Sequence, residues 1–355
     1  MKLAQIRKNI DQIDDEILDL LSKRMELGLR AKKFKNTIQD KDREKQVLRR
    51  MKKHGRNLQL IESDFVETLF REIMERNRAI QEQAKRLIGF QGDHGAFSEV
   101  AAKYYDPNLV AIPCHEFSDV FKGVQEGCLD LGIVPVENSL GGSVSQVNEQ
   151  LIECSLKVIG AVKLRINHCL LALPETHFKE IKTVYSHPQA LSQCRSFLTQ
   201  KRLESRPFYD TAGAAGMLKK EGSKTAAAIA SQLCGNLYNL KIIKDHIEDN
   251  SSNFTRFFIL AKEEKITGAN RCSIIFSLPH KAGALFSILE IFARANINLT
   301  RVESFPQRKS PGFYFFWLDF ERKENLNQVS KILEEVSSKT KMLKYLGCYQ
   351  EEVFQ

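Results

Sequence analysis

Residues 131–139 read Leu131-Gly132-Ile133-Val134-Pro135-Val136-Glu137-Asn138-Ser139, an apolar run that ends in three polar residues. A short apolar run of this kind is typical of a buried strand. Five similar runs lie on either side of it, separated by helical patterns; they span residues 87–90, 158–164, 183–185, 241–243 and 256–260. Because strands alternate with helices, we predict an α/β domain over residues 88–265 with a largely parallel sheet.

Small or polar residues follow several of these strands, where the next helix begins. The clearest stretches are Gly92-Asp93-His94-Gly95-Ala96-Phe97-Ser98, Ser186-His187-Pro188-Gln189-Ala190-Leu191 and Asp210-Thr211-Ala212. Pro188 suits the first position of a helix, and Asp210 suits a capping position. In a doubly wound sheet such helix starts gather at one crevice, where their free N–H groups bind anions. Each stretch alone could equally be an ordinary cap.

Residues 1–87 predict helices only and therefore a separate all-α domain. The first helix is expected to run to about Lys35, and two more are expected over residues 42–53 and 64–87. Three thin helices bury too little apolar surface to be stable alone, which favours a helical dimer. The first helix carries its apolar residues at helical spacing; they include Ile6, Ile10, Ile13 and Ile17.

Two cations extend this apolar stripe. Along one continuous helix, Lys35 would lie about 16 Å beyond Arg24 and within roughly 20° of the same direction. A buried unpaired charge is costly, so these cations need an anionic partner. The partner is either a carboxylate of the protein or a dianionic ligand, and the sequence leaves both open. Arg7 lies about 25 Å from Arg24 along the helix, so we expect it to serve a second chain.

Residues 270–355 predict the order strand, helix, strand, strand, helix, strand of a ferredoxin-like α+β domain. The strands are expected over residues 272–278, 298–304, 313–320 and 344–348, and the helices over residues 283–295 and 326–337. The charged segment 262–270 is the expected linker.

Composition is that of a multidomain globular protein. The chain has 355 residues, more than one typical domain of ~150 residues, and 43% of them are hydrophobic. No apolar run approaches the ~20 residues of a membrane helix, and charges near the start argue against a secretory signal. The eight cysteines form no Cys-x-x-Cys pair, so we expect reduced thiols in the cytoplasm.

Positive charge is in excess and concentrated early. Lys and Arg number 53 against 44 Asp and Glu, and residues 1–87 hold 22 against 15. Such a segment can bind nucleic acid, anionic lipid or a small anionic molecule. Because aromatic residues do not interleave with these basic residues, we expect no nucleic-acid partner, and we expect no membrane partner either.

The polar residues of the helical segment resemble those of the all-helical chorismate mutases over residues 1–87. The resemblance implies that Arg7 of the other chain, Arg24 and Arg43 bind carboxylates. It also implies that Lys35 and Gln81 face the ether oxygen and that Glu44 holds a hydroxyl group. The resemblance adds Asp40 and Asn77 to the site, and the family more often has Ser in place of Asn77. A Claisen rearrangement needs no metal or nucleophile, only a fixed reactive conformer and donors at the breaking C–O bond.

The middle segment resembles prephenate dehydratase, a family with two α/β lobes like those of periplasmic binding proteins. The resemblance implies that Thr255 donates to the departing hydroxyl group, that Arg256 anchors a carboxylate and that no cofactor is needed. His187 is a second candidate acid, although it suits capping equally well. Asp93 and Ala96 depart from the family's usual first loop. The implied substrate site also contains Glu137, Asn138, Ser139, Ser186, Gln189, Thr211 and Phe257.

The last segment resembles an ACT amino-acid-sensing domain, on the stretches Lys281-Ala282-Gly283-Ala284-Leu285 and Glu303-Ser304-Phe305-Pro306. The resemblance implies feedback by L-phenylalanine, with the effector carboxylate at the helix start and its ammonium group at Glu303. A packing domain without a ligand is the alternative. The family usually has Arg in place of Phe305. The implied effector residues are Gly283, Ala284, Leu285, Asn298, Leu299, Glu303 and Ser304.

Taken together, the three resemblances predict a bifunctional enzyme of phenylalanine biosynthesis. It would convert chorismate to prephenate and prephenate to phenylpyruvate, without cofactor or metal, as a homodimer or higher homo-oligomer. The nearest alternative uses arogenate, which carries an amine where prephenate carries a keto group. A non-catalytic amino-acid sensor is a further alternative.

Overall fold

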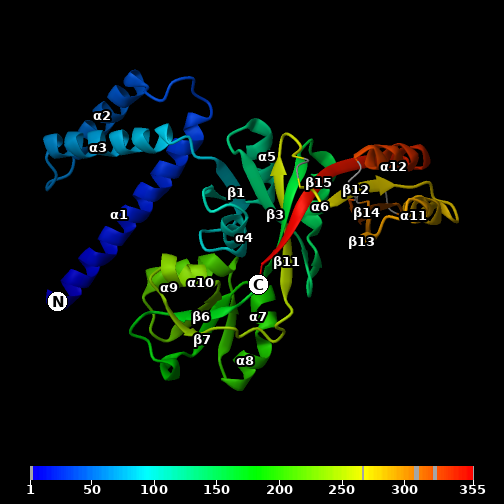
Figure 1. Ribbon diagram of the computed structural model, residues 1–355. Helices are drawn as coiled ribbons and strands as arrows, with labels where there is room; N and C mark the ends of the chain where they lie inside the picture. Colours follow the sequence, from blue (N-terminus) through cyan, green and yellow to red (C-terminus); the bar gives the residue numbers. More distant parts are fainter. Residues whose placement is uncertain (1–2, 266–267, 308–311, 323–325, 355) are drawn as a thin grey trace. The chain divides into compact units, whose positions relative to one another are not determined.

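The computed structural model of the chain describes residues 3–265, 268–307, 312–322 and 326–354 (Figure 1). Two compact units emerge from its contacts. One comprises Met1–Leu87 with Gly127–Leu129, and the other comprises Ile88–Glu126 with Asp130–Gln355. Residues 266 and 267 of the expected linker lie outside the described residues.

The first unit is all-helical, as predicted. Its helices are α1 (Leu3–Lys32), α2 (Lys41–Gly55) and α3 (Ser63–Glu82). Helix α3 packs against both α1 and α2. The core between the helices is small, and it consists of Leu29, Val47, Val66, Ile73 and Met74.

Two helix ends were predicted wrongly. Helix α1 ends at Lys32 rather than near Lys35, because the next backbone N–H groups bond to carbonyls three residues back and tighten the chain into a turn. Helix α3 ends at Glu82 rather than at residue 87. Ala84 has a φ of 49°, which no right-handed helix accommodates, and Leu87 already begins a strand.

Helix α1 leaves a long row of apolar side chains uncovered within one chain. Ile10 and Ile13, for example, are 51% and 56% exposed. Monomeric proteins rarely expose such a row, which is typical of a surface that another chain covers. Among the described residues, no helix combines the length and the apolar character needed to cross a bilayer.

The first lobe of the second unit is a sheet with helices packed on it. Its central strands are arranged in the order β5-β11-β3-β1-β2, with β4 paired to β3. The strands are β1 (Leu87–Gln91), β2 (Val110–Cys114), β3 (Leu131–Asn138), β4 (Gly142–Ser143), β5 (Lys157–Arg165) and β11 (Phe254–Ala261). The helices are α4 (Phe97–Tyr105), α5 (Phe117–Glu126) and α6 (Ser145–Glu153).

The second lobe is a five-stranded sheet in the order β10-β6-β9-β7-β8. The strands are β6 (Cys169–Ala172), β7 (Thr183–Ser186), β8 (Glu204–Pro207), β9 (Ala226–Ala230) and β10 (Lys241–Lys244). The helices are η1 (Phe178–Glu180), α7 (Pro188–Gln193), α8 (Arg195–Gln200), α9 (Thr211–Glu221) and α10 (Gln232–Leu237). The chain crosses between the lobes twice, at residues 166–168 and 245–253.

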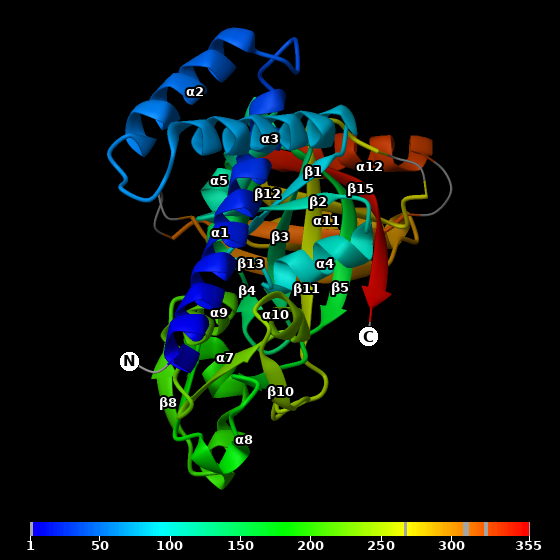
Figure 2. The ribbon, with the colours of Figure 1, turned by 90° about the vertical axis from the view of Figure 1, so that its left-hand side faces the viewer.

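The prediction of a largely parallel sheet was wrong, because both sheets are mixed. Strand β11 is antiparallel to both β3 and β5, which lie beside it (Figure 2). Strands β3 and β5 run toward the second lobe, whereas β11 brings the chain back from it and must run the opposite way. The second sheet is mixed as well, since β6 is antiparallel to β9 and β10, and β7 is parallel to β8 and β9.

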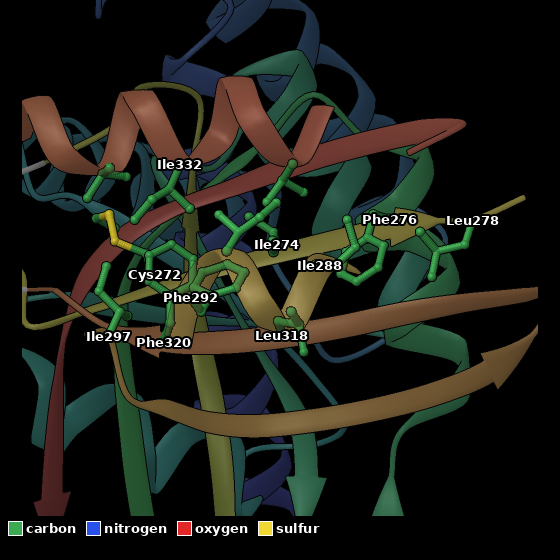
Figure 3. Close-up of a cluster of buried hydrophobic side chains, with 14 of the residues drawn as sticks. Cys272, Ile274, Phe276, Leu278, Ile288, Phe292, Ile297, Leu318, Phe320 and Ile332 are labelled. Carbon is green, nitrogen blue, oxygen red and sulfur yellow. A yellow bond between two sulfur atoms is a disulfide. The ribbon is translucent and has the colours of Figure 1, made fainter. Parts of the chain in front are cut away.

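The predicted strand and helix order of the last segment was correct. The elements are β12 (Arg271–Ser277), α11 (Ala284–Arg294), β13 (Leu299–Pro306), β14 (Tyr314–Glu321), α12 (Leu326–Lys339) and β15 (Met342–Phe354). Helices and sheet enclose one apolar core, which includes Ile274, Ile288, Phe292 and Ile332 (Figure 3). Strand β15 continues beyond this core and pairs with β5, so one sheet runs through both domains.

One pair of cysteines is oxidised, which corrects the expectation that all thiols are reduced. Cys272 and Cys348 form a disulfide, and the other six cysteines are buried and belong to no disulfide. The two residues face each other directly on the paired strands β12 and β15. They are 76 residues apart in sequence, so spacing alone gave no sign of the pair.

Candidate functional site

In the helical unit, two buried amides of α3 face α1. Asn77 and Gln81 are 8% and 6% exposed. The Gln81 Nε2 donates to the Gly28 carbonyl at 3.1 Å and also to the Asn77 Oδ1. A β-carbon at Gly28 would lie 2.2–2.7 Å from atoms of the Asn77 amide, so glycine is what allows this close approach. The buried Gln81 Oε1 has no hydrogen-bond partner within the described part of the chain.

Arg24 lies one helical turn before Gly28. It is half-buried, and burial lowers the pKa of its guanidinium group. No carboxylate of the described residues forms an ion pair with Arg24, so the protein offers it no charge partner there. Arg24 is thus a half-buried cation with no carboxylate partner among the described residues, an arrangement that suits a carboxylate ligand.

Lys35 does not share the helix with Arg24. It is exposed in the turn after α1, so the predicted common direction of the two side chains was wrong. Lys32 contacts α3 instead, because its Nζ donates to the backbone carbonyl of Gln81. Sequence reasoning missed Lys32. It lies eight residues, or about two helical turns, beyond Arg24, and the early end of α1 distinguishes it from Lys35.

The polar residues at the start of α2 have partners inside the unit. Asp40 caps the helix by accepting from the Arg43 N–H at 2.9 Å. Glu44 forms an ion pair with Arg78 of α3, which sequence reasoning also missed. Arg7 is exposed on α1. The structure thus brings Asn77 and Gln81 against Gly28, one helical turn after Arg24, whereas Arg7 lies about five turns before Arg24 on α1.

In the α/β segment, residues 88–265, the structure brings Asn138 and Thr255 together. Strands β3 and β11 pair these two residues in register, and both are 9% exposed. The Asn138 Nδ2 donates to the Thr255 Oγ1 at 2.9 Å. Since no acceptor for the Thr255 hydroxyl proton occurs among the described residues, this proton is available to a ligand. Asn253, which sequence reasoning left out, also accepts from the Asn138 Nδ2 at 2.8 Å.

Gln189 reaches this pair from the second lobe. A β-carbon at Gly141 would lie 2.5 Å from the Gln189 Nε2, so the amide of Gln189 rests on the loop that follows Asn138. His187 caps α7, since its Nδ1 accepts from the Gln189 N–H at 3.2 Å. The alternative that His187 acts as a cap is thus the one observed. Gln189 therefore lies beside the loop that follows Asn138, where the two lobes meet.

Arg256 lies on the opposite face of β11, which separates it from Thr255. Neighbouring residues of a strand point to opposite faces. The Arg256 guanidinium donates to the Asp319 carboxylate and to the Tyr349 hydroxyl at 2.9 Å, and its Nε forms an ion pair with Glu351 at 2.5 Å. Burial alone would lower its pKa, but these groups outweigh burial and raise it. The charge of Arg256 is thus balanced by acidic residues at the junction with residues 271–355, while Arg256 also lines the polar cavity there, and its role as a carboxylate anchor stays a prediction.

Other residues of the implied substrate site also lie away from the Asn138 and Thr255 side chains. Glu137 and Ser139 line a polar cavity of about 240 Å³ on the Arg256 side, together with Arg301. Phe257 is 2% exposed and packs in the core of the first lobe. Ser186 is fully buried, and its hydroxyl donates to the Ile229 carbonyl at 2.6 Å.

Thr211 is the first residue of α9, and the predicted cap Asp210 accepts from the Gly213 N–H. Asp210 also accepts from the Asp93 N–H of the first lobe, at 3.4 Å. Burial raises the pKa of Asp210, and the nearby carboxylate of Asp93 adds to the effect. This contact is a second place where the two lobes meet.

The implied effector residues lie on both faces of the last sheet. Gly283, with a φ of 76°, caps α11, and Ala284 and Leu285 follow it on the helix side. Glu303 lies opposite Trp317 in the register, on the face without helices. Its carboxylate accepts from the Arg301 Nε at 3.0 Å and from the hydroxyl of Ser143, which lies in the α/β segment.

The other three effector residues lie along β13 or just before it. The Asn298 Nδ2 donates to the Glu321 carboxylate at 3.2 Å, and Leu299 packs against the helix-side core. Ser304 pairs in register with Phe316, a residue of the helix side. Of these seven residues, Glu303 is the one with a hydrogen bond to the α/β segment among the described contacts.

Family models match three successive parts of the chain. The model described as prephenate dehydratase matches residues 88–265, and the model of chorismate mutase type II matches residues 6–82. The model of the ACT domain matches residues 273–338.

Individual proteins are similar over most or all of the chain. The bifunctional chorismate mutase/prephenate dehydratase of Aquifex aeolicus is 32% identical over 365 positions, which cover 100% of this chain and 99% of that protein. Arogenate dehydratase/prephenate dehydratase 2 of Arabidopsis thaliana is 40% identical over 274 residues, 74% of this chain and 72% of that protein. The crystal structure of prephenate dehydratase in complex with L-Phe from Arthrobacter aurescens is 28% identical, covers 74% of this chain and 89% of its own, and has a TM-score of 0.68.

Proposed function

The chain belongs to the family of bifunctional chorismate mutase/prephenate dehydratases, and we infer from this that it carries out two consecutive steps of phenylalanine biosynthesis. Residues 1–87 would rearrange chorismate to prephenate, and residues 88–265 would convert prephenate to phenylpyruvate. Residues 270–355 form the ACT domain, through which L-phenylalanine regulates the enzyme. The observation that carries the proposal is that a full-length bifunctional relative matches from end to end.

For the mutase step, we propose that Arg24 binds a substrate carboxylate beside the amides of Asn77 and Gln81. Arg24 is half-buried without a carboxylate of its own among the described residues, which supports this role. The oxygen of the breaking C–O bond gains negative charge in the transition state, and the Gln81 Nε2 would serve it as a donor by exchanging its bond to Asn77 for one to the substrate. We also propose that Arg43 and the Arg7 of a second chain bind substrate carboxylates. Asp40 and Glu44 would support the site from α2.

For the dehydratase step, we propose that Thr255 donates to the departing ring hydroxyl group. The bond from the ring to its carboxylate breaks and releases carbon dioxide, and its electron pair enters the ring. The C–O bond then breaks, and the oxygen leaves as water after gaining a proton. Because the Asn138 N–H already occupies the Thr255 oxygen, the hydroxyl proton points away from Asn138 and can serve the leaving group. Gln189 would bind the substrate from the second lobe.

The exposed apolar row on α1 supports a homodimer formed by the helical unit. We expect the double substitution Ile10→Glu and Ile13→Glu to give a monomer, because four carboxylates would meet in each dimer interface. Mutase activity should be lost with the contribution of Arg7, whereas dehydratase activity should persist. Sedimentation velocity measures the first effect, and Gln12→Glu on the same helix is the control. A double variant that stays dimeric with full mutase activity would refute this interface.

One assay tests the whole function. Pure protein with chorismate should yield phenylpyruvate through transient prephenate, and millimolar L-phenylalanine should change the rate. Since the Arabidopsis relative is named for arogenate as well, arogenate is the second candidate substrate, and it would yield phenylalanine directly. Mass spectrometry of the products from each substrate decides between them. We propose that the enzyme acts in the cytoplasm.

A further inference from the structure

The orientation of the Asn138 side-chain amide is fixed by two backbone N–H groups, which can only donate. The N–H groups of Leu140 and Gly141 both donate to one atom of this amide, at 3.1 and 2.7 Å. That atom must be the oxygen, since a nitrogen would have no lone pair to offer. The other atom is therefore the nitrogen, and it faces Thr255 and Asn253.

This assignment determines every further group in the chain of contacts. The Asn253 atom that faces the Asn138 nitrogen must be an acceptor oxygen, so the other atom of Asn253 is a nitrogen. That nitrogen lies 3.1 Å from one side-chain atom of Gln193, which must then be an oxygen. The same Gln193 oxygen lies 3.0 Å from the His168 Nε2, which must therefore carry a proton.

The hydrogen bonds form one continuous chain from His168 to Thr255, in which the donor of each bond is fixed. Both His168 and Asn253 donate to Gln193, and Asn138 donates to both Asn253 and Thr255. If any of these amides were reversed, two donors or two acceptors would face each other in a buried place. Asn253 and His168 are 0% and 2% exposed, so water could not readily replace a lost partner.

We propose that His168, Gln193 and Asn253 are positioning residues for the dehydratase, which through Asn138 hold the Thr255 hydroxyl with its proton free for the leaving group. The proposal rests on the proposed role of Thr255. It assigns a function to the two segments that connect the lobes, because His168 and Asn253 lie one on each of them. The two segments are also bonded to each other, through the Ile166 N–H and the Asn253 carbonyl at 2.8 Å.

The test compares two substitutions of Gln193. Gln193→Glu keeps an oxygen for both donors, whereas Gln193→Met keeps the length of the side chain but removes the acceptor. We expect Gln193→Met to lower kcat for dehydration by ~10²-fold with KM changed little, as a misplaced catalytic group does. Gln193→Glu should stay within about threefold of wild type on the same reasoning. Gln200→Met, on the exposed end of α8, is the matched control.

Mutase activity of each variant reports whether the protein is intact, and a thermal melt reports whether the dehydratase domain is folded. Wild-type kcat in Gln193→Met, a loss confined to KM, or an equal loss in Gln193→Glu would each overturn the positioning role. Wild-type protein that dehydrates neither prephenate nor arogenate would instead overturn the proposed function.

A spectroscopic measurement tests the proposal without a change at Gln193. In protein labelled with ¹⁵N-histidine, the His168 resonance should show a proton on Nε2 and none on Nδ1. The His168→Gln variant identifies the resonance. A proton on Nδ1 in place of Nε2 would contradict the series of donors and acceptors.

Discussion

Replacement of Thr255 by alanine is expected to lower kcat for dehydration by ~10²–10³-fold, the usual cost of removing one donor from a developing oxyanion. The substitution removes the only hydroxyl group in the contact with Asn138, and with it the proton for the departing oxygen. Chorismate mutase activity should be unchanged, because Thr255 belongs to a different unit of the chain. Steady-state kinetics with prephenate and with chorismate measure both effects in one preparation.

Thr255→Ser is the matched control for this substitution. Serine keeps the hydroxyl group at the same place on β11, and activity should remain within about tenfold of wild type. Thr255→Val keeps the shape and removes the proton, so it should resemble alanine. Near wild-type dehydration by Thr255→Val would show that the donor is another group.

Replacement of Arg24 by alanine is expected to lower mutase kcat/KM by ~10²–10³-fold, because a partly buried carboxylate of the substrate would lose its charged partner. The reason lies in the surroundings of Arg24, which is half-buried and has no carboxylate partner among the described residues. Dehydratase activity measured with added prephenate should be unchanged.

Lys23→Ala is the control for Arg24→Ala, because Lys23 is the neighbouring residue and is exposed. Its mutase activity should equal that of wild type. Arg24→Lys separates charge from geometry, since lysine cannot form the two parallel bonds of a guanidinium group. If Arg24→Ala retained mutase activity while Lys23→Ala lost it, the assignment of the carboxylate site would be wrong.

Local patterns predicted most elements of the fold. The order of strands and helices after residue 270 followed from alternating apolar runs, and His187 and Asp210 cap helices where the sequence suggested caps. These features depend on residues close together in the chain. The direction of β11 was missed because it depends on the path of the chain between the two lobes, which no local pattern records.

The candidate site was predicted less completely, because it depends on which strands pair and on which face of a strand each side chain lies. Thr255 and Arg256 are adjacent in sequence, yet a strand sends them to opposite faces. Lys35 was placed by extending a helix that ends three residues earlier. Asn253, Gln193 and His168 gave no separate signal, since each is an ordinary polar residue until β3 and β11 bring their segments together.

The central claim is that two independent sites on one chain act in sequence on the same ring acid. Mixing the Arg24→Ala and Thr255→Ala proteins tests it most directly, because each variant would retain the site that the other lacks. Neither protein alone should turn chorismate into phenylpyruvate at an appreciable rate, and the mixture should do so with prephenate released into solution between the two steps. A mixture no more active than its components, although one still forms prephenate and the other still consumes it, would contradict independent sites.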